Sequence, residues 1–77
     1  MENAIRVDTM EKWNRFASKL SDHGYSLWVF QHQYDDPEGF HAWFGAPDWP
    51  DVEIYTHSKS VQDAILHYHL GCPDRIP

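Results

Sequence analysis

Apolar residues recur with a helical period in two stretches of the chain, one near each end. In the first stretch the apolar stripe consists of Met10, Trp13, Phe16, Ala17 and Leu20. Asp8 followed by Glu11 has the form of a capping box, and Gly24 offers a left-handed stop. Because these signals frame a continuous stripe of period 3.6, the pattern predicts a helix over about 9–22.

The second helical stretch begins after residue 57 and has a shorter stripe. Its apolar positions are Val61, Ala64, Ile65 and Tyr68. Ser58 or Ser60 is expected to cap its first turn. The helix is expected to end at Gly71, Cys72 and Pro73, which leaves residues 72–77 as a C-terminal tail.

The region between the two helices has the pattern of three strands. Residues 25–34 are rich in β-forming side chains, and residues 40–44 resume as a strand after a turn at 35–39. Residues 45–51 have the composition of a loop, whereas residues 52–57 alternate cleanly between apolar and polar positions. The pattern therefore predicts a hairpin followed by a third strand.

These elements predict an α+β fold with the order helix–strand–strand–strand–helix. Residues 1–77 are too few for a second domain, and residues 1–7 are interpreted as an N-terminal arm or a short edge strand. The economical arrangement has two layers, with a three-stranded antiparallel meander and both helices packed on one face. The same order of elements occurs in double-stranded RNA-binding domains, but the basic cluster expected at the second helix is missing here.

The two faces of the sheet are assigned from one assumed register, in which Tyr34 lies opposite Phe40. That register places on the core face Trp28, Phe30, Phe40 and Phe44. It places on the other face Leu27, Val29, Gln31, Gln33, His41 and Trp43. A slip of one residue would invert one strand relative to its partner.

Exposed aromatic residues on that second face are the leading candidate for a binding surface. The candidate residues are Trp43, Tyr55, Val29, Leu27, His41 and Trp49. The competing interpretation is that residues 1–7 or residues 45–51 fold over this face and complete a second layer of core. Self-association is the simplest form of the binding hypothesis, because a twofold contact needs only one surface.

Charge is distributed unevenly along the chain, which has a formal net charge of −6. Between Lys19 and Lys59 there is no lysine or arginine. Acidic residues expected around the sheet are Asp35, Asp36, Glu38, Asp48, Asp51 and Glu53. This balance disfavours direct nucleic-acid binding, but it allows a second hypothesis, in which the acidic surface imitates nucleic acid and inhibits a DNA- or RNA-binding protein.

Candidate chemistry is sparse. The chain has six histidines, but none at the local spacing of a zinc motif, so neither a metal nor another cofactor is predicted. His41 and His57 are expected to share the open face, near Glu53 or Tyr55. No phosphate-binding loop or nucleophile motif is present, and no catalytic residue is assigned.

The sequence thus favours a small, acidic, non-enzymatic module that binds a protein partner or a second copy of itself. Metal or small-ligand binding through the histidines is a third hypothesis. A lone Cys72 and the absence of a signal peptide or a membrane-spanning stretch predict a cytoplasmic protein without membrane contact.

Overall fold

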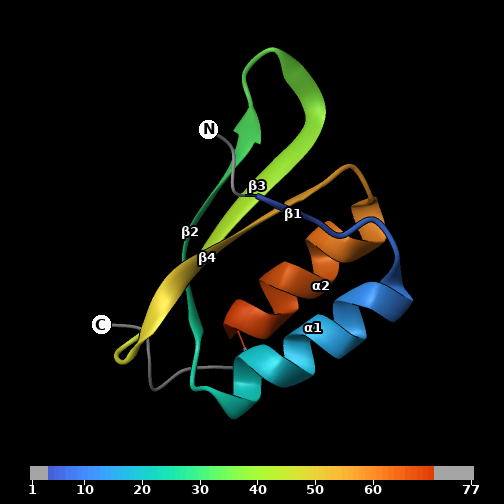
Figure 1. Cartoon of the computed structure of the whole chain (residues 1–77). Helices are drawn as coiled ribbons and strands as arrows, with labels where there is room; N and C mark the ends of the chain where they lie inside the picture. The colour runs from blue at the N-terminus through green and yellow to red at the C-terminus, as the bar shows by residue number, and fades with distance from the viewer. Residues whose placement is uncertain (1–3, 71–77) are drawn as a thin grey trace.

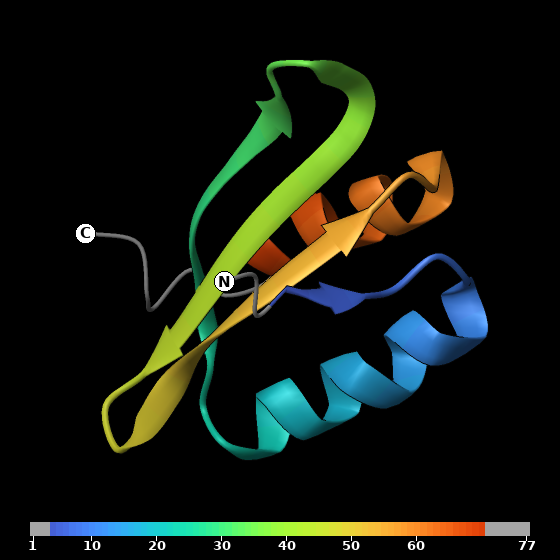
Figure 2. The same ribbon diagram turned by 45° about the horizontal axis from the view of Figure 1, so that its top comes forward.

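The computed structural model describes the backbone of residues 4–70 and the side chains of residues 4–68. Its elements are β1 (Ile5–Arg6), α1 (Met10–Asp22), β2 (Ser26–Gln33), β3 (Asp36–Ala46), β4 (Trp49–Thr56) and α2 (Lys59–Leu70). The strands form one sheet in the order β1-β4-β3-β2, and both helices lie on the same side of it (Figures 1 and 2). The predicted α+β fold, with an antiparallel meander and two helices on one face, is confirmed.

The N-terminal segment adds a fourth strand, β1, to the three-stranded meander. In β1, Ile5 and Arg6 pair in parallel with Ile54 and Tyr55 of β4, and the Val7 amide donates to the Tyr55 carbonyl at 3.1 Å. Of the two interpretations of residues 1–7, the short edge strand is the one observed for the part that the structure describes.

Helix α1 begins one residue later than predicted, because its N-cap is Thr9 and not Asp8. Thr9 is the N-cap, and its hydroxyl accepts a hydrogen bond from the Lys12 amide at 3.2 Å. Glu11 instead lies 3.5 Å from Arg15, one turn along the helix. Asp8 does not cap α1, because its carboxylate binds the end of β4. Gly24 has φ 73°, as its predicted role as a stop requires.

Helix α2 is capped by Ser58, whose Oγ accepts from the Val61 amide at 3.2 Å. Its stripe meets the core as predicted, since Val61 and Ile65 are fully buried. The predicted end at residues 71–73 and the tail at 72–77 lie outside the described residues.

The core lies between the helix stripes and the inner sides of β3 and β4. Phe44 and Ile54 are fully buried at its centre. The Trp13 ring of α1 packs 6.3 Å from Phe44, and the Tyr68 ring of α2 packs 5.8 Å from it. A single β3 side chain therefore contacts both helices, which fixes the two layers against each other.

The predicted register of the β2–β3 hairpin is wrong, and β2 also contains a bulge that the prediction did not include. Leu27 pairs with Phe44 and Val29 with Trp43, so Trp28 is the extra residue. The bulge reverses the faces at this end of the strand. Leu27 is therefore buried in the core rather than on the open face, and Trp28 is 63% exposed rather than buried.

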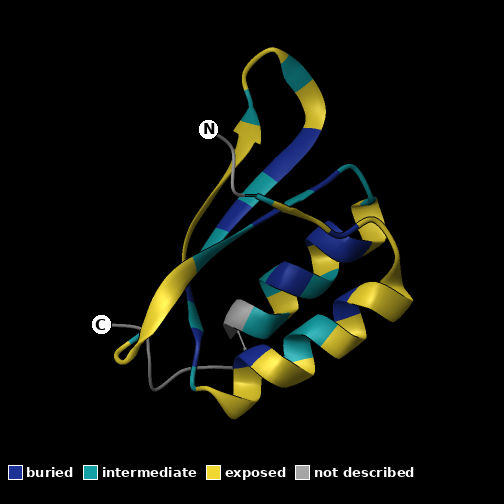
Figure 3. Cartoon of the chain, in the orientation of Figure 1, coloured by how far each residue is buried: buried dark blue, intermediate teal, exposed yellow. Residues whose placement is uncertain are grey.

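Beyond the bulge, the faces agree with the prediction although the pairing is shifted by two residues. Phe40 lies opposite His32 rather than Tyr34, and Phe30 lies opposite Ala42. Phe30 does share a face with Phe40, with the two ring centroids 5.6 Å apart. It is nevertheless 43% exposed, because this end of the hairpin extends past the helices (Figure 3).

Both predicted loops between the strands are shorter than the composition indicated. The segment 35–39 contributes only Asp35 to the turn, and β3 already begins at Asp36. In 45–51, only Pro47 and Asp48 separate β3 from β4. Of the prolines of these segments, Pro37 and Pro50 are the second residues of β3 and β4, where proline is tolerated in a sheet, and Pro47 lies in the turn between these strands.

Candidate functional site

The sheet face opposite the helices carries a broad concavity of about 760 Å³. Its lining residues come from all four strands, the β2–β3 turn and the residue before β1: Ala4, Arg6, Gln31, Gln33, Asp35, Asp36, His41, Trp43, Glu53 and Tyr55. We call this surface the open face. Neither segment that could have covered this face does so among the described residues. Residues 5–6 form an edge strand, and residues 45–51 form the end of β3, a two-residue turn and the start of β4.

Three aromatic rings form the floor of the open face. The His41 ring stacks on Trp43, with centroids 5.4 Å apart and an angle of 14° between planes. On its other side, the Tyr55 ring lies 4.6 Å away. These residues occupy the two central strands at matching positions, since His41 lies opposite Tyr55 and Trp43 opposite Glu53. The Tyr55 ring is tilted by 47° against His41, so the floor is a contiguous row of three packed rings and not one flat surface.

Two glycines allow aromatic side chains to lie close against the β3 backbone. A Cβ atom built on Gly39 would meet the Tyr55 hydroxyl at 2.3 Å, and one built on Gly45 would meet the Trp28 ring at the same distance. Both separations are far below van der Waals contact. Glycine at these positions therefore lets Tyr55 and Trp28 lie flat on the sheet.

The pair formed by His41 and Glu53 is half-buried in the floor. His41 Nδ1 lies 2.6 Å from Glu53 Oε2, and the two side chains are only 14% and 19% exposed. Because Glu53 accepts the Nδ1 hydrogen bond, the ring orientation that stacks on Trp43 is held in place. The two residues were expected to lie near each other, and they do.

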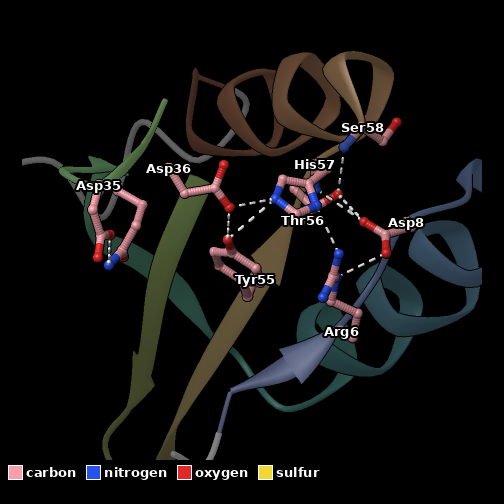
Figure 4. Close-up of polar contacts among 9 residues, drawn as sticks. Arg6, Asp8, Asp35, Asp36, Tyr55, Thr56, His57 and Ser58 are labelled. Carbon is pink, nitrogen blue, oxygen red and sulfur yellow. Dashed lines mark hydrogen bonds and ion pairs between the residues drawn. The ribbon is translucent and has the colours of Figure 1, made fainter. Parts of the chain in front are cut away.

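A second polar cluster closes one end of the open face (Figure 4). Arg6 Nη2 lies 2.7 Å from His57 Nδ1, and His57 Nε2 lies 2.6 Å from Asp36 Oδ2. A guanidinium can only donate, so Nδ1 accepts and the imidazole proton resides on Nε2, directed at Asp36. Tyr55 donates its hydroxyl proton to the same Asp36 oxygen at 2.7 Å.

These contacts set the protonation of Asp36 and Tyr55. Hydrogen bonds from His57 and Tyr55 hold the pKa of Asp36 below its usual value. The same carboxylate, by accepting the Tyr55 proton, raises the pKa of Tyr55. Both groups therefore keep their ordinary neutral-pH forms over a wider pH range.

Asp8 anchors the cluster to the backbone of β4. Its Oδ1 accepts from the Thr56 hydroxyl at 3.0 Å and from the His57 amide at 2.9 Å, and its Oδ2 lies 2.8 Å from Arg6 Nε. Burial raises the pKa of Asp8, but the hydrogen bonds from His57 and Thr56, together with the Arg6 charge, outweigh it. The net result is a pKa below the usual value.

The structure brings together most of the predicted binding-surface residues. Trp43, Tyr55 and His41 form the floor, and Val29 lies beside Trp43 on the adjacent strand. Leu27 is buried on the opposite side. Trp49 lies away from the floor, with its ring 4.5 Å from His23 at the end of α1.

The predicted acidic surface is divided among several places. Asp35, Asp36 and Glu53 line the open face, whereas Glu38 lines a hollow beside Lys59 at the start of α2. Asp51 lies near Ile5 at one margin of the sheet, and Asp48 is exposed in the β3–β4 turn. The six acids therefore do not form one continuous array.

Sequence reasoning missed Arg6 and Asp8 as members of the site. Their contacts span about fifty positions of the chain, and neither belongs to a local motif. The signal that could have found them is the alternation of Ile5, Arg6 and Val7, which places an arginine on the polar face of an edge strand.

Known proteins offer no guide to this arrangement. No protein family, curated protein or solved structure matches the chain. Within the described residues, no group of three or more potential ligands is placed to hold a metal ion. Neither described helix is long and apolar enough to cross a membrane.

Proposed function

We propose that this chain is a non-enzymatic protein-binding module whose open face holds an arginine-bearing segment of a basic partner. The observation that carries the proposal is the aromatic floor of His41, Trp43 and Tyr55, which lies in a concavity on the side of the sheet that the described residues leave uncovered. Rigid aromatic surfaces of this kind supply contact area at low entropic cost.

The charge of the open face favours a cationic occupant. The described residues that line it include three carboxylates, Asp35, Asp36 and Glu53, and one guanidinium, that of Arg6. Arg6 is already engaged by Asp8 and His57. The surrounding protein is acidic overall, so its field attracts basic partners and repels phosphate backbones.

A planar cation fits this surface better than a compact one. The Arg6 guanidinium of the chain itself lies 5.0 Å from the centre of the Tyr55 ring, which supports the packing of a guanidinium on the aromatic rings of this face. Guanidinium groups stack on aromatic rings and donate in a fork to carboxylates, whereas an ammonium is a strongly hydrated point charge. We therefore expect arginine to be preferred over lysine.

The hydrogen bonding of the site supports a binding role over catalysis. Both ring nitrogens of His57 are occupied, by Arg6 and by Asp36, so it has no free lone pair to take a proton from a substrate. His41 is oriented by Glu53 as a general base would be, but the described residues that line the concavity include no serine, threonine or cysteine that it could activate.

Titration with a short peptide of alternating arginine and serine tests the proposal. Calorimetry should show binding that weakens as salt is raised, with a weaker response to the lysine analogue and none to a glutamate analogue. Nuclear magnetic resonance shifts should map to Trp43, Tyr55 and their neighbours on β3 and β4.

Matched variants locate the binding. Glu53→Gln keeps the side-chain shape and should reduce affinity, and Trp43→Ala should reduce it further. Trp49→Ala removes an exposed tryptophan outside the concavity and should leave binding unchanged. The proposal fails if the arginine peptide does not bind at low salt, or if Trp49→Ala weakens it as much as Trp43→Ala.

A further inference from the structure

A hollow of about 360 Å³ lies on the helix side of the sheet, between α1 and β4. Its floor is apolar, with Phe16 and Leu20 from α1 and Val52 from β4. We call this hollow the α1 groove. It shares no described lining residue with the open face, which lies on the other side of the sheet.

Contacts at the end of α1 hold the α1 groove in shape. Tyr25 lines the floor and donates its hydroxyl proton to the Pro50 carbonyl at 2.7 Å. His23 Nδ1 donates to the Lys19 carbonyl at 2.9 Å, and the Trp49 ring packs on His23 with centroids 4.5 Å apart. Because these contacts tie the end of α1 to the start of β4, the groove is formed without a ligand, as is usual for binding sites.

The rim of the α1 groove concentrates positive charge on an otherwise acidic chain. Lys12, Arg15 and Lys19 line it, which is half of the chain's six lysines and arginines. The described lining residues include no aspartate or glutamate. Arg15 has an exposed ion pair with Glu11 at 3.5 Å, whereas neither lysine has an ion pair with a described residue. The rim therefore offers uncompensated cations beside an apolar floor.

The spacing of these cations indicates how long a complementary anion must be. An α-helix rises 1.5 Å per residue, so Lys12 and Lys19 are separated by about 10 Å along α1. Three residues of an extended peptide span about the same length. Acidic residues on either side of one apolar residue thus match both the row of cations and the floor beneath it.

Other anionic ligands match the α1 groove less well. A fatty acid offers a single carboxylate to three cations. A flat membrane does not reach the floor, where Leu20 and Tyr25 are buried. A nucleic acid extends its phosphates beyond the groove, onto a protein whose net charge is −6, and is repelled there. An acidic peptide confines its charge to the rim.

We propose that the α1 groove binds an acidic segment of a partner protein, in which acidic residues flank one large apolar side chain. The apolar side chain enters the groove and contacts Phe16 and Val52. The flanking carboxylates pair with Lys12 and Lys19, and they compete with Glu11 for the nearby arginine. The chain thereby holds an acidic segment on its helix side, independently of any occupant of the open face.

Fluorescence anisotropy with a labelled peptide of glutamates around one leucine tests the proposal. We expect saturable binding that weakens as salt is raised. The alternating glutamate–serine peptide has no apolar side chain and should not bind, and a peptide of glutamines around leucine should not bind either. Nuclear magnetic resonance shifts should map to Phe16, Leu20 and Val52 and not to the open face.

Matched charge changes locate the bound peptide. Lys19→Gln should weaken binding about threefold, and its combination with Lys12→Gln should weaken binding about tenfold. Lys59→Gln makes the same charge change at an exposed residue of α2 outside the groove, and it should leave binding unchanged. All three variants replace exposed lysines, so the fold is retained.

The proposal is overturned if the leucine peptide does not bind at low salt, or if Lys59→Gln weakens binding as much as Lys19→Gln. Equal binding of the glutamate–serine peptide also overturns it, because the floor then plays no part. Binding to phosphatidylserine vesicles without binding to the peptide would assign the groove to a membrane and overturn it too. The arginine peptide should bind Lys19→Gln as it binds the wild type, so failure of one proposal leaves the other standing.

Discussion

The two edges of the sheet differ in length, in charge and in whether side-chain contacts tie them to the neighbouring strand. The β1 edge has two residues, one of them Arg6, and its end is tied to β4 through Asp8. The β2 edge has eight residues, no charge and three exposed apolar side chains. Charged, short edges resist pairing with other chains. Among the described residues, the β1 edge therefore has this protection and the β2 edge lacks it.

The largest expected effect comes from a change in the core on which both edges of the sheet pack. Phe44→Ala removes the fully buried β3 side chain that contacts both helices. Phenylalanine-to-alanine changes in cores typically cost about 3–5 kcal/mol. We expect a loss of that size in the free energy of urea unfolding, with exchange at both edges accelerated together.

The control for this core change is Tyr34→Ala, which alters an aromatic residue that is 99% exposed. Surface changes of this kind stay within about 0.5 kcal/mol. If Phe44→Ala exposes only one edge to exchange, the two edges belong to separate cooperative units and do not share one core.

The next largest effect concerns the β1 edge, which we call the closed edge because Asp8 and Arg6 tie it to the end of β4. Asp8→Ala removes the acceptor of the Thr56 hydroxyl, which belongs to a fully buried residue, and of the His57 amide. Leaving such donors unsatisfied costs about 1–3 kcal/mol. Chemical denaturation should show this loss, and exchange should accelerate in β1 while β2 is unaffected.

Asp63→Ala is the matched control, because it removes an exposed carboxylate from α2. It should change stability by less than about 0.5 kcal/mol. Equal effects of the two substitutions would mean that Asp8 acts through net charge and not through its hydrogen bonds.

Acid should loosen the closed edge before the open one. The pKa values of Asp8 and Asp36 are lowered in the folded protein, so the unfolded chain binds more protons as pH falls. The stabilisation is therefore fully present above the unfolded value of about 4 and is lost as pH falls through the folded values. Unfolding free energies measured between about pH 5 and pH 2 should decrease, with a shallower slope in Asp8→Asn. An identical slope in that variant would contradict the assignment.

The comparison of edges also shows how far the sequence alone could lead. The two helix stripes are local periodic signals. Trp13 and Leu20 of the first and Val61 and Ile65 of the second are buried as expected, whereas Met10 is exposed. The predicted two-layer fold followed from them, because amphipathic helices need a shared apolar surface. The alternation around Tyr55 likewise placed the aromatic floor correctly.

What the sequence could not reveal depends on contacts between distant residues. The bulge at Trp28 leaves no trace in the alternation of β2, yet it moves Leu27 into the core. Asp36 was predicted to lie in a turn, because aspartate is common there. Its contact with His57 forms only because β3 and the end of β4 lie side by side in the sheet. Asp8 likewise fitted a local capping motif, but a partner 49 positions away determines its role.

The smallest expected effect comes from removing the charge of Arg6 at the β1 edge. Arg6→Gln keeps a polar side chain but removes the charge-assisted contacts to Asp8 and His57 and the stacking on Tyr55. Exposed ion pairs contribute about 0–1 kcal/mol, so global stability should change little. Local exchange at the Val7 amide, which donates to Tyr55, should accelerate nevertheless. A similar acceleration in the free amides of β2 would show that Arg6 stabilises the whole sheet, whereas a change confined to Val7 would establish that the charge closes one edge only.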